Sequence, residues 1–145
     1  MNLLQLTLSG GGAFREVSAI VGGLSFRTAT RSLPGTPHTI YDVLWHTERS
    51  QQLLLSHASG ADVDWGAVGS LWPPTVSEEE WARVLRDFEV GLAHAQMLAE
   101  DPSERARDAL TDLAAHNAYH LGQVVLLRQL LGDWNPPVTL GGEVA

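Results

Sequence analysis

Hydrophobic and polar positions follow the 3.6-residue period of an α-helix in several stretches of this chain. The longest stretch runs over 103–131, two more cover about 39–56 and 77–99, and a shorter one covers 13–24. No segment shows the two-residue alternation of a half-buried strand. The pattern predicts an all-α fold in which four amphipathic helices pack as one bundle.

Capping signals predict where the three longer helices begin. Thr39 with Asp42 three residues later forms a capping box, as do residues 77–80, whose acidic side chains favour a helix N-terminus. Residues 101–104 predict the start of the last helix, with Pro102 at its first helical position. These signals define helices separated by connections of very different lengths.

Glycine and proline mark the connections. Three successive glycines within 9–12 predict a break in the N-terminal helical region, and the proline-containing segment 25–38 is interpreted as a loop. The segment 59–76 holds three glycines, two prolines and two tryptophans without a helical period. A connection of that length predicts a crossover between the second and third main helices, which then run parallel.

Two histidines stand four residues apart in the longest helical pattern. His116 and His120 therefore share one face, and they interrupt an otherwise apolar stripe. Buried imidazoles need polar partners, which a divalent metal could supply; hydrogen bonds to the backbone, Asp112 or Gln123 are the alternative. Asn117 follows the first histidine where a His-Glu-x-x-His protease carries glutamate, so that class is excluded.

His46 offers a third ligand from a second helix. It shares a helical face with Val43, Ser50 and Leu53, which directs its ring towards the interior. Three histidines with a fourth coordination position left open are typical of a catalytic metal site rather than a closed structural one.

These segments resemble a known family. Residues 116–128 and 131–137 resemble the C-terminal signature of the DinB/YfiT-like superfamily, and residues 40–46 resemble its first metal-ligand helix. The resemblance implies a four-helix bundle of up-down-down-up topology that holds a divalent metal, often nickel or zinc. Carried over by position, the metal ligands are His46, His116 and His120.

The resemblance also implies an activity. Relatives include S-transferases in which a low-molecular-weight thiol, such as bacillithiol or mycothiol, attacks an electrophilic substrate. Two alternatives stay open: hydrolysis by metal-bound hydroxide, with Glu48 or Asp42 near the metal as the general base, and a non-enzymatic, stress-related metal-binding protein. Arg49 and Arg128 could bind an anionic substrate group, although we interpret both as surface arginines. Self-association as a homodimer, through helix faces near the N-terminus, is a further expectation.

Composition narrows the classes of function. A chain of 145 residues is the size of one domain, so we predict a single domain over 1–145. The net charge of −8 and nine scattered arginines disfavour a nucleic-acid partner. The chain has neither lysine nor cysteine, so any thiol chemistry requires a small-molecule thiol. No apolar run reaches the roughly 18 residues of a membrane span, and no basic signal segment opens the chain; we therefore predict a cytoplasmic location.

Overall fold

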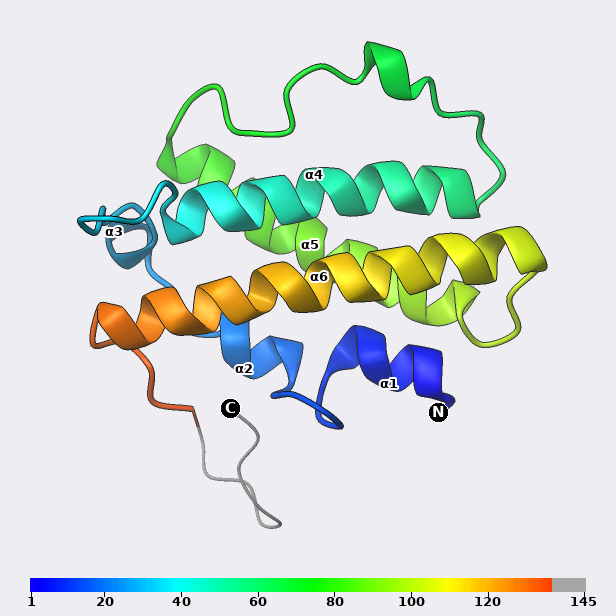
Figure 1. Ribbon diagram of the computed structural model, residues 1–145, viewed down its shortest axis with the longest axis horizontal. Coiled ribbons are helices and arrows are strands. Elements are labelled where there is room, and N and C mark those ends of the chain that lie inside the picture. The colour runs from blue at the N-terminus through cyan, green and yellow to red at the C-terminus, as the bar shows by residue number, and fades with distance from the viewer. Residues whose placement is uncertain (137–145) are drawn as a thin grey trace.

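The computed structural model describes residues 1–136, and every regular element in that part of the chain is helical, which confirms the all-α prediction (Figure 1). In chain order the elements are α1 (Leu3–Ser9), α2 (Val17–Val21), α3 (Phe26–Ala29), α4 (Ile40–Ala58), the 3₁₀ helix η1 (Trp65–Ala67), α5 (Glu78–Leu98) and α6 (Glu104–Leu130). Among these described helices, none is both long and apolar enough to cross a membrane.

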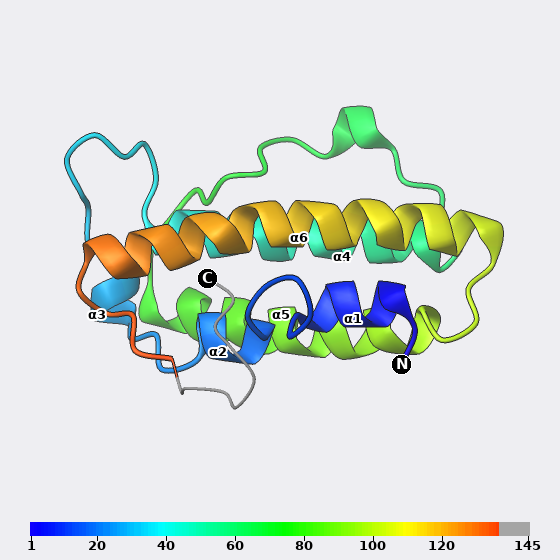
Figure 2. The same cartoon turned by 60° about the horizontal axis from the view of Figure 1, so that its bottom comes forward.

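The three long helices lie side by side along the length of the molecule. Helices α4 and α5 run in the same direction and α6 runs in the opposite direction, while α1 and α2 follow one another along the side formed by α5 and α6 (Figures 1 and 2). Helix α4 makes its most extensive contact with α6. The long connection passes outside α4 before it returns to the start of α5.

The predicted capping box opens α4. The Thr39 hydroxyl accepts a hydrogen bond from the Asp42 amide at 3.2 Å, and the Asp42 carboxylate accepts one from the Thr39 amide at 3.0 Å. Each side chain therefore satisfies a backbone donor that the helix leaves free at its first turn. The helix extends to Ala58, two residues beyond its predicted end.

The start of α6 differs from the prediction. Ser103 is the cap, because its hydroxyl accepts a hydrogen bond from the Ala106 amide at 3.2 Å. Pro102 therefore lies outside the helix, and its placement at the first helical position was wrong. Ser77 caps α5 as predicted, since its hydroxyl accepts from the Glu80 amide at 3.1 Å. The predicted capping box is incomplete, because the Ser77 amide donates to the Tyr41 hydroxyl and the Glu80 carboxylate accepts from Arg83 instead.

The glycine run breaks the N-terminal helical region, as predicted. Gly10 follows α1 with φ of 73°, and a Cβ built on it would lie 2.3 Å from the Arg15 carbonyl oxygen. Only glycine tolerates that approach. The helix resumes at Val17 rather than at Ala13, and the predicted loop 25–38 contains the short helix α3.

A polar bridge joins the three long helices. The Gln51 amide of α4 donates to the Phe88 carbonyl of α5 at 3.0 Å, and the Asn117 amide of α6 donates to Gln51 at 3.1 Å. Gly91 makes room for this bridge, because a Cβ there would lie 2.3 Å from the Gln51 amide nitrogen. The bridge therefore fixes the register of α6 against α4 at the residue that follows His116.

Arg128 is not a surface residue, so our interpretation of it was wrong. Its side chain is buried near the end of α6, where the guanidinium donates to the carbonyl oxygens of Ile20 and Gly22, each at 2.8 Å. It also donates to the Asp133 carbonyl at 2.8 Å. Arg128 thus ties α2 and the segment after α6 to the helix, which leaves it poorly placed to bind a substrate.

Candidate metal centre

Three histidines converge between α4 and α6. Their ring nitrogens include one atom from each of His46, His116 and His120, all within 4.8 Å of one another. The Nε2 atoms of His46 and His116 are 3.3 Å apart, and the His120 ring centroid lies 4.6 Å from that of His46 and 4.5 Å from that of His116. Antiparallel packing of α6 on α4 therefore places side by side residues that are far apart in the sequence.

Hydrogen bonds to Nδ1 orient two of the rings. His46 Nδ1 lies 3.0 Å from the Leu71 carbonyl oxygen, and His120 Nδ1 lies 2.8 Å from Gln123 Oε1. Both partners can only accept, so each Nδ1 carries the proton and each neutral ring keeps its lone pair on Nε2. This is the arrangement that metal-binding histidines ordinarily adopt.

The spacing of His46 and His116 fits a small divalent ion. Two nitrogens bound tetrahedrally at about 2.0–2.1 Å lie about 3.3 Å apart. That separation matches the distance between the Nε2 atoms of His46 and His116. Three imidazoles leave a fourth position for another ligand. The geometry therefore suits zinc, nickel and other imidazole-binding ions alike.

Burial keeps the His46 and His116 rings neutral and able to bind. It lowers the pKa of His46, and it is the main cause that lowers the pKa of His116 to about 4, with further contributions from the neighbouring charges of His120 and His46. Desolvation disfavours the charged form of an imidazole, and a protonated neighbour disfavours it further. Near pH 7 the lone pairs of His46 and His116 are therefore available.

The connection between α4 and α5 contributes to the site in a way that the sequence did not indicate. The Trp72 ring stacks on His46 with centroids 4.3 Å apart and on His38 with centroids 3.8 Å apart, nearly parallel in both cases. The Leu71 carbonyl, one residue earlier, accepts the hydrogen bond from His46. No period or motif in 59–76 could have identified either residue.

The two carboxylates considered as bases have other contacts. Glu48 is buried, and its Oε2 lies 3.3 Å from the Arg83 guanidinium of α5. Burial raises the pKa of Glu48, against the effect of Arg83. Asp42 caps α4 through the Thr39 amide. The hydrogen bonds of Glu48 and Asp42 in the described structure thus go to groups other than the three histidines.

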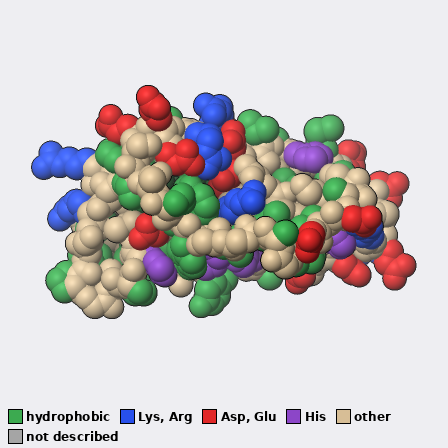
Figure 3. All heavy atoms as spheres, turned by 90° about the horizontal axis from the view of Figure 1, so that it is seen from above, with side chains coloured by type: hydrophobic (Ala, Val, Ile, Leu, Met, Phe, Trp, Pro, Cys, Tyr) green, Lys and Arg blue, Asp and Glu red, His purple; other side chains and the backbone are tan. Residues whose placement is uncertain are grey.

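The other histidines and Arg49 lie outside the three-histidine cluster. His57 is held by Arg105, whose guanidinium lies 3.1 Å from the His57 ring, and His94 is exposed on α5. Arg49 donates to Gln52 at 3.3 Å. His38 is connected to the cluster through Trp72, on which it stacks. Histidine side chains are visible on the face that carries the long connection (Figure 3).

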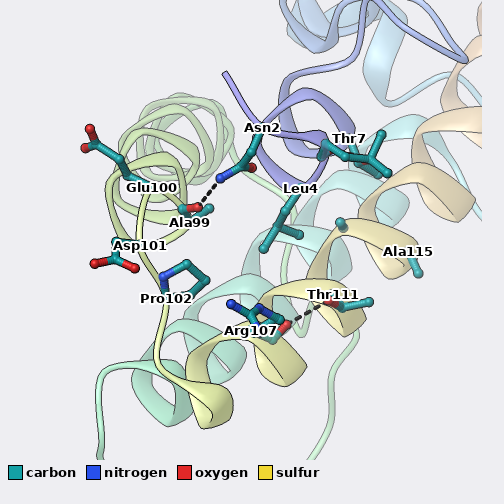
Figure 4. A pocket seen from close by; sticks show the side chains of 12 residues that line it. Asn2, Leu4, Thr7, Ala99, Glu100, Asp101, Pro102, Arg107, Thr111 and Ala115 are labelled. Atoms are coloured by element: carbon teal, nitrogen blue, oxygen red, sulfur yellow. Dashed lines mark hydrogen bonds between the residues drawn. The ribbon is translucent and has the colours of Figure 1, made fainter.

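A large groove lies away from the histidines. It has a volume of about 610 Å³ between α1 and α6, with Leu4 and Thr7 on one wall and Thr111 and Ala115 on the other (Figure 4). Its lining contains no histidine. The groove therefore adds no histidine to the cluster between α4 and α6.

Comparisons with known proteins found no relative of this chain. No protein-family model matches this chain, and no match is found among curated proteins or solved structures.

Proposed function

We propose that this chain is a divalent-metal-binding protein of the DinB/YfiT-like type that transfers a low-molecular-weight thiol to an electrophile. The observation that carries this proposal is the convergence of His46, His116 and His120, with the His46 and His116 Nε2 atoms 3.3 Å apart. The proposed architecture is a four-helix bundle of up-down-down-up topology. In it α1 and α2 together take the place of the first helix, and the long connection joins the parallel helices α4 and α5.

Neighbouring residues orient two of the proposed ligands, and burial affects the third. His46 is held by Leu71 and Trp72, and His120 is held by Gln123, so that their Nε2 lone pairs face inward. Burial keeps His46 and His116 neutral. A metal bound by three neutral imidazoles supplies a Lewis acid with an open position, which can stabilise a thiolate or acidify bound water. Zinc and nickel are the ions that we propose.

Thiol transfer is preferred to hydrolysis because of the contacts of the two carboxylates. The absence of cysteine is compatible with transfer, in which the thiol comes from a small molecule of the bacillithiol or mycothiol class. The hydrolytic alternative assigned the general base to Glu48 or Asp42, whose carboxylates contact Arg83 and the Thr39 amide instead. A non-enzymatic metal-binding protein, in which the ion only ties α4 to α6, is the remaining alternative.

Metal analysis followed by a thiol screen tests the proposal. Protein purified without a histidine tag or added metal is analysed for bound ions, then supplied with single thiols and a generic electrophile. We expect stoichiometric zinc or nickel and thiol-dependent consumption of the electrophile, both lost in His116→Ala. Ester or amide cleavage without a thiol would favour the hydrolase. Bound metal with no turnover would favour the binding protein.

A further inference from the structure

His46 takes its support from outside its own helix. His116 and His120 are one turn apart on α6, so the helix places both rings on one face, and Gln123 of the same helix holds His120. His46 is the single ligand from α4. An isolated imidazole can turn about its side-chain bonds and can exchange its proton between the two nitrogens. Something beyond α4 must therefore fix both the plane and the tautomer of His46.

The long connection supplies both constraints from two adjacent residues. The Leu71 carbonyl accepts the hydrogen bond from His46 Nδ1 at 3.0 Å, which sets the tautomer. The Trp72 ring lies 4.3 Å from the His46 ring with an angle of 10° between the planes, which sets the ring plane. Together they leave His46 one orientation, in which its Nε2 atom faces His116.

Trp72 is itself held in place by the segment that leads into α4. Its second face stacks on His38 at 3.8 Å with an angle of 8°. His38 Nδ1 in turn lies 3.9 Å from the carboxylate of Asp42, the residue that completes the cap of α4. Since a ring covers each face of Trp72, its faces cannot receive a flat substrate. Its geometry suits the support of His46.

We propose that Trp72 is a positioning residue of the metal centre: it holds the plane of the His46 ring so that the Leu71 carbonyl can accept the Nδ1 proton, and it thereby raises the affinity for the metal. The inference rests on the proposed metal-binding function. It assigns the connection 59–77 a role in metal binding as well as in joining α4 to α5. Residues that support metal ligands in this way typically change metal affinity by roughly 10- to 100-fold when they are removed.

Zinc affinity, measured by competition with a chromogenic chelator, tests the proposal on the full chain. Trp72→Ala should weaken zinc binding by roughly 10- to 100-fold, whereas Trp72→Phe, which keeps a stacking ring, should remain close to wild type. Trp65→Ala is the matched control, because Trp65 belongs to the same connection but is 53% exposed and packs near His57 instead. Trp72→Ala binding zinc as tightly as Trp65→Ala would overturn the proposal.

A second readout needs no metal. In chelator-treated protein, the nitrogen-15 signals of the His46 ring should report a single tautomer protonated at Nδ1 in the wild type and in Trp72→Phe, and a mixture of tautomers in Trp72→Ala. An unchanged His46 tautomer in folded Trp72→Ala would overturn the role of Trp72. If the wild type fails to bind zinc, the proposed function fails, and the tautomer measurement still decides whether Trp72 positions His46.

Discussion

The Nε2 atoms of His46 and His116 lie 3.3 Å apart, although 70 positions separate the two residues in the chain. His46 Nε2 carries a lone pair, because its Nδ1 proton is committed to the Leu71 carbonyl. Without an ion, His116 must turn an Nε2 proton towards His46, and its buried Nδ1 has no partner among the described residues. An ion bound between the rings would instead use both Nε2 lone pairs.

Changing any one of the three histidines to alanine should remove most of the bound metal and leave the helical fold intact. In the proposed site each ring supplies one of three protein ligands, whereas the apolar contacts of α4 and α6 extend well beyond the cluster. Metal analysis and circular dichroism of each variant measure the two effects. His94→Ala, on the exposed face of α5, is the control and should keep its metal. Full metal content in His120→Ala would contradict the assignment.

Local signals in the sequence predicted the part of the site that lies on one helix. The spacing of His116 and His120 determines that they share a face, because the helical period alone relates them. His46 could be added only as a residue on an inward stripe, or through the family resemblance. Its distance from His116 depends on how α4 packs on α6. Trp72 depends on the path of an irregular connection, for which no local rule exists.

Arg128 could have been recognised from the helical period. It follows Val124 by four residues and Leu121 by seven, and both of those residues are buried. We gave more weight to the general exposure of arginine than to this spacing. By contrast, the carbonyl oxygens that satisfy Arg128 belong to Ile20 and Gly22, and no sequence pattern relates these residues to the end of α6.

Replacing Arg128 by methionine should destabilise the protein by roughly 2–5 kcal/mol. The change keeps much of the side-chain volume but leaves the carbonyl oxygens of Ile20, Gly22 and Asp133 without their charged donor, at about 1–3 kcal/mol for each such group that stays buried. Urea unfolding measures the difference. Arg86→Met is the control, because the Arg86 side chain is 66% exposed, and it should change stability by less than about 0.5 kcal/mol. Equal effects of the two changes would contradict the structural role of Arg128.

Two glycines within helices should respond in opposite ways to alanine. Gly122 lies inside α6, where a Cβ would meet nothing within 4 Å, so Gly122→Ala should stabilise the protein by about 0.5–1 kcal/mol through helix propensity. Gly91→Ala should destabilise it, because the new Cβ would collide with the Gln51 amide and disturb its bonds to Phe88 and Asn117. Urea unfolding of both variants gives the comparison.

A destabilised Gly122→Ala would show that the outer face of α6 is covered in solution. Gly122 is exposed in the structure. A measurement of the oligomeric state would then show whether a second copy of the chain covers it. Stabilisation by Gly91→Ala would show instead that the bridge through Gln51 adds nothing to the packing of α4 against α5.

Acid should destabilise the metal-free protein through His116. Its pKa falls from the ordinary value of 6.5 to about 4, first because it is buried and then because His120 and His46 add positive charge when protonated. The unfolded chain therefore binds a proton in a range of pH where the folded chain does not. The contribution of His116 to stability is complete above pH 6.5, decreases as the pH falls towards 4, and is lost below that value. His46, whose pKa burial also lowers, acts in the same direction.

Unfolding of chelator-treated protein by urea at pH 7.5, 6.5, 5.5 and 4.5 measures this loss of stability. His116→Asn should reduce the loss, because asparagine does not titrate.

Bound metal should make the stability depend more strongly on pH, since a protonated imidazole cannot bind an ion. The metal-loaded protein should therefore melt above the chelator-treated protein at pH 7.5, and the difference should shrink near pH 5.5. Identical melting temperatures at pH 7.5, in protein shown beforehand to hold metal, would mean that the ion does not stabilise the packing of α4 on α6.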